Sequence, residues 1–283
     1  VISLIASGVW NLIVRLGQLL LDGLDLLITN IFINATSMGI LSVSKLIPSA
    51  ITGVVSTLVN VFSPNFTILY AQKESDKFIK AVKQSMNIMG ILANIPIIVL
   101  IVCGRRFYEL WQPTQNATQL YILSLLTCMG LIFNGGINCI YDVFTVVNKL
   151  KWNAIGVCIT GALNTLTVYI LLRRTDLGLV AVAGVSSALA IIRNLLFTVP
   201  YGAHCLNLRW YTFYPNVIKP VIFVAISSIC GLFIEQKVCF GGWFGLIVLV
   251  IITIIISVCL GFGIILNRND RDVIIRMLRQ GKE

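Results

Sequence analysis

Three charged side chains lie inside a stretch of the sequence that is long and apolar enough to cross a lipid bilayer. Arg15, Asp22 and Asp25 fall within residues 7–29, whose other side chains are mostly hydrophobic. In a helix with about 100° between successive residues, these charges and Gln18 share one stripe about 80° wide. A charge inside a membrane costs kilocalories unless it faces protein or water. The stripe therefore predicts one wall of a polar chamber within a membrane protein.

Two further apolar stretches carry milder polar stripes. Along residues 38–68, Lys45 and Asn60 share a face about 80° wide with several serines and threonines. Along residues 119–144, the shared polar face holds Asn134, Asn138 and Asp142. Small hydroxyl residues also line close contacts between membrane helices. Helix packing and cavity lining therefore remain equal interpretations of these two stripes.

Three basic residues lie inside predicted membrane spans, namely Arg15, Lys45 and Arg193. Long cations pack poorly between helices, and their guanidinium and ammonium groups bind phosphate well in a site shielded from water. This chemistry favours an anionic ligand in the chamber. Two interpretations stay open for the carboxylates of the stripes, which either bind a coupling cation or proton or neutralise the cations.

The composition as a whole is that of a membrane protein. The chain has 283 residues, of which 58% are hydrophobic and 11% are charged, and its mean hydropathy is +0.94. About 20 apolar residues cross a bilayer core, and this length predicts an all-α polytopic protein with about eight transmembrane helices. They cover residues 5–33, 38–68, 82–103, 119–144, 152–172, 178–201, 215–234 and 242–266.

The predicted spans divide into two groups. The first six, within residues 1–204, form one transporter lobe that contains the stripes. The last two, within residues 205–266, have no sustained polar stripe and suit peripheral, lipid-exposed helices. Apart from Arg15, Lys45 and Arg193, thirteen lysines and arginines fall on one side of the membrane and five on the other. This asymmetry predicts that the tail at 267–283 and the loop at 71–85 face the cytoplasm.

No motif for catalysis or cofactor binding accompanies the stripes. His204 is the only histidine and lies near the end of a span, so we expect no enzyme activity. The eight cysteines lie mostly in apolar runs without metal-ligand spacing, and we expect neither a metal nor a cofactor. The formal net charge is +10, but the basic residues belong mainly to loops, and nucleic acid is not an expected partner.

One part of the sequence resembles a known family. From Trp10 to Glu74 the chain has a polar helix ending in LD-LLI, a small-residue turn, the pattern MG-LS-SK-IP, and a helix closing on P-N-T-LYA before a charged loop. This order is similar to the start of the second six-helix lobe in bacterial polysaccharide repeat-unit flippases. These flippases belong to the multidrug/oligosaccharidyl-lipid/polysaccharide exporter superfamily. Beyond Glu74 the resemblance is carried by hydropathy and loop order.

The resemblance implies a fold, a location and a partner. Family members have twelve to fourteen spanning helices in two six-helix lobes around a central cavity, and this chain is similar to helices seven to fourteen. Residues 1–204 would be helices seven to twelve, and a missing N-terminal lobe would be the partner. Val1 in place of an initiator methionine agrees with that expectation. The protein would be a multi-pass protein of the bacterial cytoplasmic membrane.

The resemblance also implies a function. Basic residues in the family's cavity contact the diphosphate of an undecaprenyl-linked oligosaccharide, the repeat unit of O-antigen or capsule polysaccharide, and two lobes rock to move it across the bilayer. By this resemblance Arg15 and Lys45 are the expected diphosphate contacts, and Arg193 is a weaker candidate. The expected cavity-lining or cation-coupling residues are Gln18, Asp22, Asp25, Asn60, Asn134, Asn138 and Asp142.

Three alternatives compete with this function. A cation-coupled multidrug exporter of the same superfamily would depend more on the carboxylates than on the cations. A lipid II flippase shares the same helix plan. A membrane enzyme of polysaccharide assembly would need a large extracytoplasmic loop with paired catalytic residues, and the sequence has no such loop.

Overall fold

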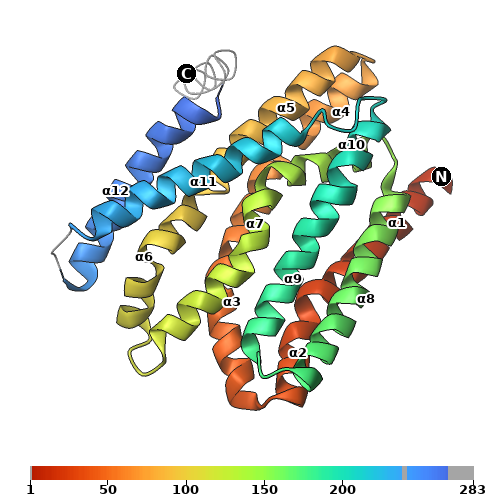
Figure 1. Ribbon diagram of the computed structural model, residues 1–283. Helices are drawn as coiled ribbons and strands as arrows, with labels where there is room; N and C mark the ends of the chain where they lie inside the picture. Colours follow the sequence, from red (N-terminus) through yellow and green to blue (C-terminus); the bar gives the residue numbers. More distant parts are fainter. Residues whose placement is uncertain (1, 238–240, 267–283) are drawn as a thin grey trace.

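The computed structural model describes residues 2–237 and 241–266, and this part of the chain is an all-α bundle (Figure 1). Within it, seven helices are long and apolar enough to cross a membrane. They confirm the predicted class, an all-α polytopic membrane protein. The seven are Ala35–Ala71, Ser75–Trp111, Ala117–Val146, Leu150–Arg174, Leu179–Cys205, Tyr214–Glu235 and Gly242–Ile264.

The first predicted span is helical but is not one of these seven. It consists of α1 (Ile2–Gln18), a π-helical turn η1 (Leu19–Gly23) and α2 (Leu24–Phe32). A π turn adds one residue to a helix, and such turns are frequent at functional sites. The next helix, α3, begins after Asn34, whose side chain accepts a hydrogen bond from the backbone N–H of Ser37 at 2.7 Å. This N-cap separates the first predicted span from Ala35–Ala71, the first of the seven membrane-crossing segments.

The second and third predicted spans are each built from two consecutive helices. These are α3 (Ala35–Asn60) with α4 (Ser63–Ala71), and α5 (Ser75–Leu92) with α6 (Ile95–Trp111). The prediction of 82–103 is therefore too short at both ends. That prediction was based on the thickness of the apolar core of a bilayer. The helix instead continues through the charged segment SDKFIK at one end and through GRRFYELW at the other.

Three segments follow that match their predicted spans within a few residues. They are α7 (Ala117–Val146), α8 (Leu150–Arg174), and a broken helix made of α9 (Leu179–Arg193), the π-helical turn η2 (Asn194–Thr198) and α10 (Val199–Cys205). The first and the sixth segment are thus both interrupted by a π turn. Both pack against α8, and α2 of the first segment also contacts α9 of the sixth.

The helix α7 lies at the centre of the bundle, where it packs against α3, α5, α6 and α9 (Figure 1). Small residues permit these close approaches. A Cβ on Gly135 would lie 2.7 Å from the Cβ of Ala93. Where α1 meets α8, a Cβ on Gly161 would lie 2.8 Å from the carbonyl oxygen of Gly17. A side chain at either glycine would force the helices apart.

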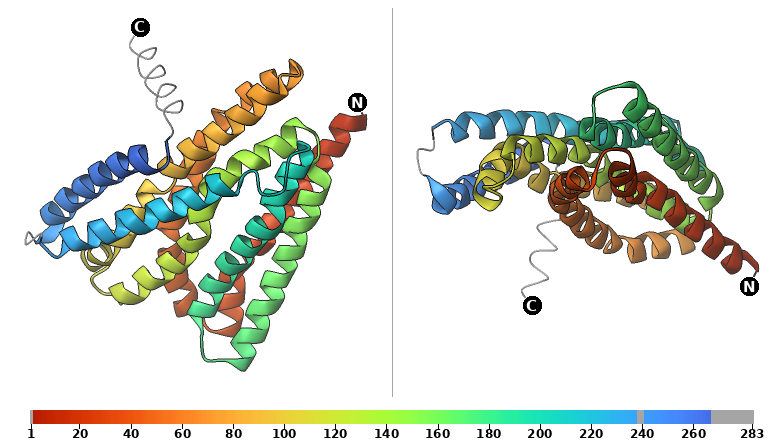
Figure 2. Two further views of the ribbon diagram at one scale, coloured as in Figure 1. Left: turned by 45° about the horizontal axis from the view of Figure 1, so that its top comes forward. Right: turned by 90° about the horizontal axis from the view of Figure 1, so that it is seen from below.

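The last two helices, α11 (Tyr214–Glu235) and α12 (Gly242–Ile264), pack on the side of α5 and α6. Both views in Figure 2 place α12 and the N-terminal end of α1 on opposite sides of the molecule. Arg106 on α6 holds α11 through the carboxylate of Glu235 at 3.1 Å. The helices α11 and α12 therefore lie at the edge of the bundle. The division of the chain into a lobe at 1–204 and two peripheral helices at 205–266 stays a prediction.

The connections between helices gather at two ends. In Figure 1 the α4–α5, α7–α8 and α10–α11 connections lie at the upper end, and the α2–α3, α6–α7 and α8–α9 connections lie at the lower end. Chain segments therefore alternate in direction, as a polytopic protein requires. The tail at 267–283 lies outside the described residues, and its cytoplasmic location stays a prediction.

Candidate functional site

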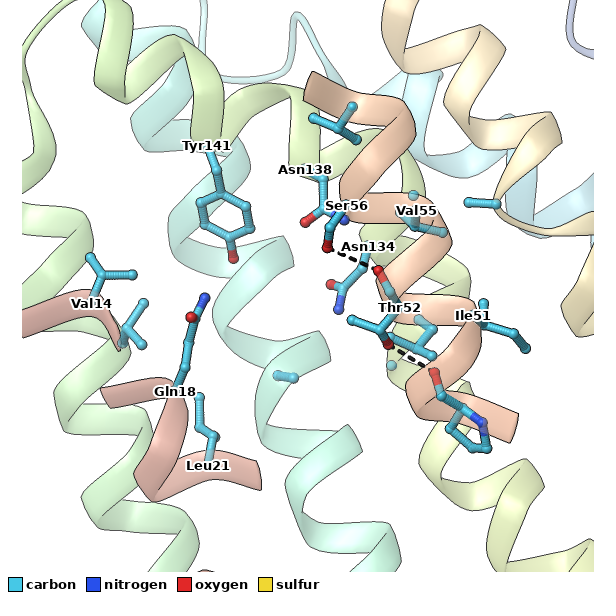
Figure 3. A pocket seen from close by; sticks show the side chains of 18 of the residues that line it. Val14, Gln18, Leu21, Ile51, Thr52, Val55, Ser56, Asn134, Asn138 and Tyr141 are labelled. Carbon is cyan, nitrogen blue, oxygen red and sulfur yellow. Dashed lines mark hydrogen bonds between the residues drawn. The ribbon is translucent and has the colours of Figure 1, made fainter. Parts of the chain in front are cut away.

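A cavity of about 620 Å³ opens between α1, α3, α7, α8 and α9. Figure 3 shows Gln18 on one side of this space, Thr52 and Ser56 on another, and Asn134, Asn138 and Tyr141 on α7. Most of these side chains end in a carboxamide or a hydroxyl group. They can donate and accept hydrogen bonds without carrying charge, which is the chemistry that recognises hydroxyl-rich ligands.

Seven of the ten residues singled out in the sequence line this cavity. They are Gln18, Lys45, Asn60, Asn134, Asn138, Asp142 and Arg193. Cavity lining therefore describes the stripes of α3 and α7 better than helix packing alone.

Only some residues of the polar stripe on the first predicted span line the cavity. Asn11 and Gln18 line the space, but Arg15 does not, and it is exposed elsewhere on α1. Asp25 is fully buried and does not line the cavity either. The helical-wheel argument assumed a uniform 100° per residue, whereas η1 inserts a residue between Gln18 and Asp25 and shifts the register of Asp25. Arg15 precedes η1, and the π turn does not account for its position. The side chain of Asp22 lies outside the described part of the structure.

The carboxylate of Asp25 instead neutralises the cation on α3. The Nζ of Lys45 lies 2.5 Å from Oδ2 of Asp25, and the Asp25 side chain is 0% exposed. On the other side, the carboxamide of Asn164 donates to the carbonyl of Leu21 at 3.0 Å and reaches Oδ1 of Asp25 at 3.5 Å. Lys45 therefore lines the cavity as one half of a buried ion pair that joins α2, α3 and α8.

The cavity wall made by α3 contains a proline. Pro48 has no N–H, so the carbonyl of Ser44 loses its helical donor. The hydroxyl of Ser124 on α7 donates to that carbonyl at 2.6 Å and lies 2.6 Å from the hydroxyl of Tyr108. One turn later, the hydroxyl of Thr52 donates to the carbonyl of Pro48 at 2.9 Å (Figure 3). The break in the helix is thus compensated by a neighbouring helix, as a membrane interior demands.

A second polar cluster surrounds η2. Asn194 is fully buried, and its Oδ1 accepts hydrogen bonds from the hydroxyl of Tyr141 at 2.7 Å and from Nη2 of Arg193 at 3.3 Å. Its Nδ2 donates to Oδ1 of Asn134 at 2.5 Å. The Nη2 of Arg193 also donates to the hydroxyl of Tyr141 at 2.8 Å. The cluster joins η2 to α7 along one side of the cavity.

Two charged groups of this cavity have atoms without a hydrogen-bond partner. The Nε and Nη1 atoms of Arg193 are shielded from solvent and have no hydrogen-bond partner, and the same holds for Oδ2 of Asp142. Within the described residues, neither side chain forms an ion pair. A buried charge without a partner is costly, so these groups differ in kind from the Lys45–Asp25 pair.

Sequence reasoning missed Tyr141 and Asn194. A tyrosine inside an apolar helix resembles an ordinary core residue, and its position on the α7 stripe was the available signal. For Asn194 the signal is stronger, because the segment IIRNLLFTVP places Arg193 and Asn194 together in an apolar run that ends at Pro200. A proline frees a carbonyl in the preceding turn, where π turns and polar partners are common.

A comparison of the chain with protein-family models, with curated proteins and with solved structures finds no match. The function must therefore be argued from this chain's own residues. Within the described residues, no cluster of three His, Cys, Asp or Glu side chains could hold a metal ion. What the cavity offers is a neutral, hydrogen-bonding wall with one unpaired guanidinium and one unpaired carboxylate.

Proposed function

We propose that this chain is one lobe of a membrane transporter that flips undecaprenyl-diphosphate-linked oligosaccharide repeat units for O-antigen or capsule synthesis. The observation that carries the proposal is the cavity of about 620 Å³ inside a bundle of membrane-crossing helices. Polar groups cost free energy inside a membrane unless they serve a path or a partner. Carboxamides and hydroxyls on facing helices suit a sugar headgroup that crosses the bilayer.

A second cavity supports an amphiphilic substrate. It has a volume of about 310 Å³, lies between α3, α6 and α12, and is lined almost entirely by apolar side chains, such as Val99, Phe107 and Val250. Ile51 lines both cavities. A polar chamber beside an apolar groove fits a lipid-linked sugar, because the headgroup and the lipid tail need opposite surroundings.

The proposal includes an orientation and a partner. The α4–α5, α7–α8 and α10–α11 connections, which lie at the upper end in Figure 1, contain the basic residues Lys73, Lys149 and Arg209, and Lys77 lies in the first turn of α5. By the positive-inside rule this end faces the cytoplasm of a bacterial cell. The exposed polar side chains of α3 cannot face lipid, so a further six-helix lobe covers them and forms the opposite wall. Rocking of two such lobes gives alternating access.

One observation favours a second candidate, a cation-coupled multidrug exporter of the same superfamily. The carboxylate of Asp142 lines the cavity with an unpartnered oxygen, which suits a proton or a cation. An exporter of this kind would need Asp142 for transport and would tolerate loss of Arg193. The flippase would show the reverse dependence.

The test uses the full-length protein, with the lobe encoded beside it if there is one, in liposomes that contain a fluorescent polyprenyl-diphosphate oligosaccharide. Transport is measured as the gain in label that a membrane-impermeant quencher reaches. We expect Arg193→Met to slow transport at least tenfold and Lys77→Ala, at the exposed Lys77–Glu74 pair, to have no effect. Transport that is equal in all variants, or that requires Asp142 but not Arg193, would reject the flippase.

A further inference from the structure

We propose that Asn194 is a positioning residue, which holds Arg193 so that the unpartnered N–H groups of this guanidinium bind an oxyanion of the transported headgroup. The inference rests on the proposed function, since it names the group that the cavity binds. Asn194 does not line the cavity itself. It acts through the side chains that do.

The contacts of Asn194 reach three cavity-lining side chains at once. Its Oδ1 accepts from Arg193 and Tyr141, and its Nδ2 donates to Asn134. Because the side chain is 0% exposed, these bonds do not compete with water. One carboxamide therefore fixes the relative positions of a cation, a phenol and an amide on two different helices.

The π turn that carries Asn194 is itself held in place. Thr198 donates its hydroxyl hydrogen to Oδ1 of Asn194 at 3.1 Å, and Tyr214 at the start of α11 donates to the carbonyl of Leu195 at 2.6 Å. Phe197 stacks on Tyr201 with ring centroids 5.4 Å apart. Side chains around η2 thus hold Asn194 from outside the cavity.

The hydrogen bonds from Arg193 to Tyr141 and Asn194, which we call the anchor, use only one nitrogen of the guanidinium. Nη2 is bound by Tyr141 and Asn194, whereas Nε and Nη1 have no acceptor. Asp142 follows Tyr141 directly in the chain, and its Oδ2 also lacks a partner. Both Arg193 and Asp142 line the cavity, and these hydrogen bonds hold the guanidinium on neutral groups instead of on this carboxylate. The positive charge stays available to a ligand.

An oxyanion is the ligand that this arrangement fits. A phosphate or carboxylate oxygen supplies the acceptors that Nε and Nη1 lack, after a small rotation of the side chain about its anchored Nη2. Charge-assisted bonds of this kind are strong in a site shielded from water. In a lipid-linked oligosaccharide the oxyanion has two possible sources, the diphosphate linkage or an acidic sugar.

The test is calorimetric titration of the full-length protein in nanodiscs with three probes, inorganic pyrophosphate, glucuronate and glucose. We expect the wild type to bind at least one of the two oxyanions. Asn194→Ala weakens that binding about tenfold or more, because Arg193 is released toward Asp142. Asn194→Ala combined with Asp142→Asn regains most of the affinity. Glucose affinity, if measurable, stays unchanged in both variants.

The matched control is Asn87→Ala on α5. Asn87 is 3% exposed and accepts a 2.7 Å bond from Nδ2 of Asn216, so this substitution also removes a buried carboxamide pair, but away from the cavity. We expect oxyanion affinity to stay within about twofold. Tyr141→Phe removes the other half of the anchor and keeps the proposal testable if Asn194→Ala does not fold. It should weaken oxyanion binding as well.

The possible outcomes separate the two proposals. Binding of pyrophosphate alone assigns the diphosphate linkage, and binding of glucuronate alone assigns an acidic sugar. A wild type that binds neither, equal losses in Asn194→Ala and Asn87→Ala, or no recovery in the double variant would overturn the inference. Intact oxyanion binding without lipid transport would reject the proposed function only, whereas transport of a neutral headgroup without oxyanion binding would reject the inference only.

Discussion

Two cations line the same cavity in opposite circumstances. Lys45 on α3 is paired with the fully buried carboxylate of Asp25, and its charge is neutralised by the protein itself. Among the residues that the structure describes, Arg193 at the end of α9 forms hydrogen bonds only to the neutral groups of Tyr141 and Asn194. Both residues are basic and both lie in membrane-crossing segments. Of the two, only Arg193 has buried nitrogen atoms without a hydrogen-bond partner.

The difference teaches that composition alone does not identify a binding residue in a membrane cavity. A buried ion pair locks helices together, and breaking it leaves an uncompensated charge. An unpaired, partly anchored guanidinium adds little to stability but offers strong donors to an anion. We therefore assign Lys45 to the scaffold and Arg193 to the proposed ligand. Four predictions test this division, from the largest expected effect to the smallest.

The largest effect is expected at the buried ion pair. Asp25→Asn leaves the Lys45 ammonium group in the bundle without a counter-charge, and we expect the free energy of unfolding to fall by about 3–5 kcal/mol. Denaturation of the purified protein in detergent micelles measures this change. The double variant Asp25→Asn with Lys45→Met removes both charges and should recover much of the loss. A single-variant loss below about 1 kcal/mol would place Lys45 with Arg193 instead.

A smaller effect is expected at the hydrogen bond between the uncharged groups of Ser124 and Ser44, which supports the α3 wall of the cavity. Ser124→Ala removes the donor to the Ser44 carbonyl, which Pro48 leaves free, and should cost about 1–3 kcal/mol. Pro48→Ala returns an N–H to that carbonyl, so the cost of Ser124→Ala should shrink in this background. Denaturation of the four proteins of this double-mutant cycle measures both costs. Equal costs in both backgrounds would show that the bond does not compensate for the proline.

Much of the fold could be predicted from the sequence. Long apolar runs locate the membrane-crossing segments, because the bilayer fixes their length, and six of the seven long helices agree with their predicted spans within a few residues at each end. The exception is α5 with α6, Ser75–Trp111, which extends beyond the predicted span 82–103 at both ends. The third predicted span was too short because a helix continues beyond the membrane wherever its backbone bonds are satisfied.

The candidate site was less predictable, and the π turns explain why. A uniform 100° per residue placed Asp25 in the stripe with Gln18, but η1 lies between these two residues and changes the register. Arg15 precedes η1, so the π turn does not explain why Arg15 is absent from the cavity lining. Likewise, helical periodicity does not predict that Asn194 points toward Tyr141, because that orientation depends on η2. Ion pairing cannot be read from the sequence either. Lys45 and Arg193 are both basic residues in apolar runs, and only the fold brings a carboxylate to Lys45.

At Arg193 we expect a small effect on stability. Arg193→Met removes two hydrogen bonds but also removes a buried charge with unpartnered donors, and these terms oppose each other. The free energy of unfolding should change by less than about 1 kcal/mol in either direction, while oxyanion binding is lost. Denaturation and calorimetry on the same preparation measure both quantities. A loss as large as that of Asp25→Asn would make Arg193 a scaffold residue and end the contrast with Lys45.

The smallest effect is expected at an ion pair that has the same chemistry as Lys45–Asp25 but lies in water. Lys77 and Glu74 are 2.8 Å apart, with side chains 71% and 37% exposed. Water solvates each charge when the other is removed, and the pair gains little from its short distance. Lys77→Ala should therefore change the free energy of unfolding by about 0.5 kcal/mol or less, measured beside Asp25→Asn under the same denaturing conditions. Comparable losses at the two sites would mean that burial does not set the value of an ion pair in this bundle, and the separation of Lys45 from Arg193 would lose its physical basis.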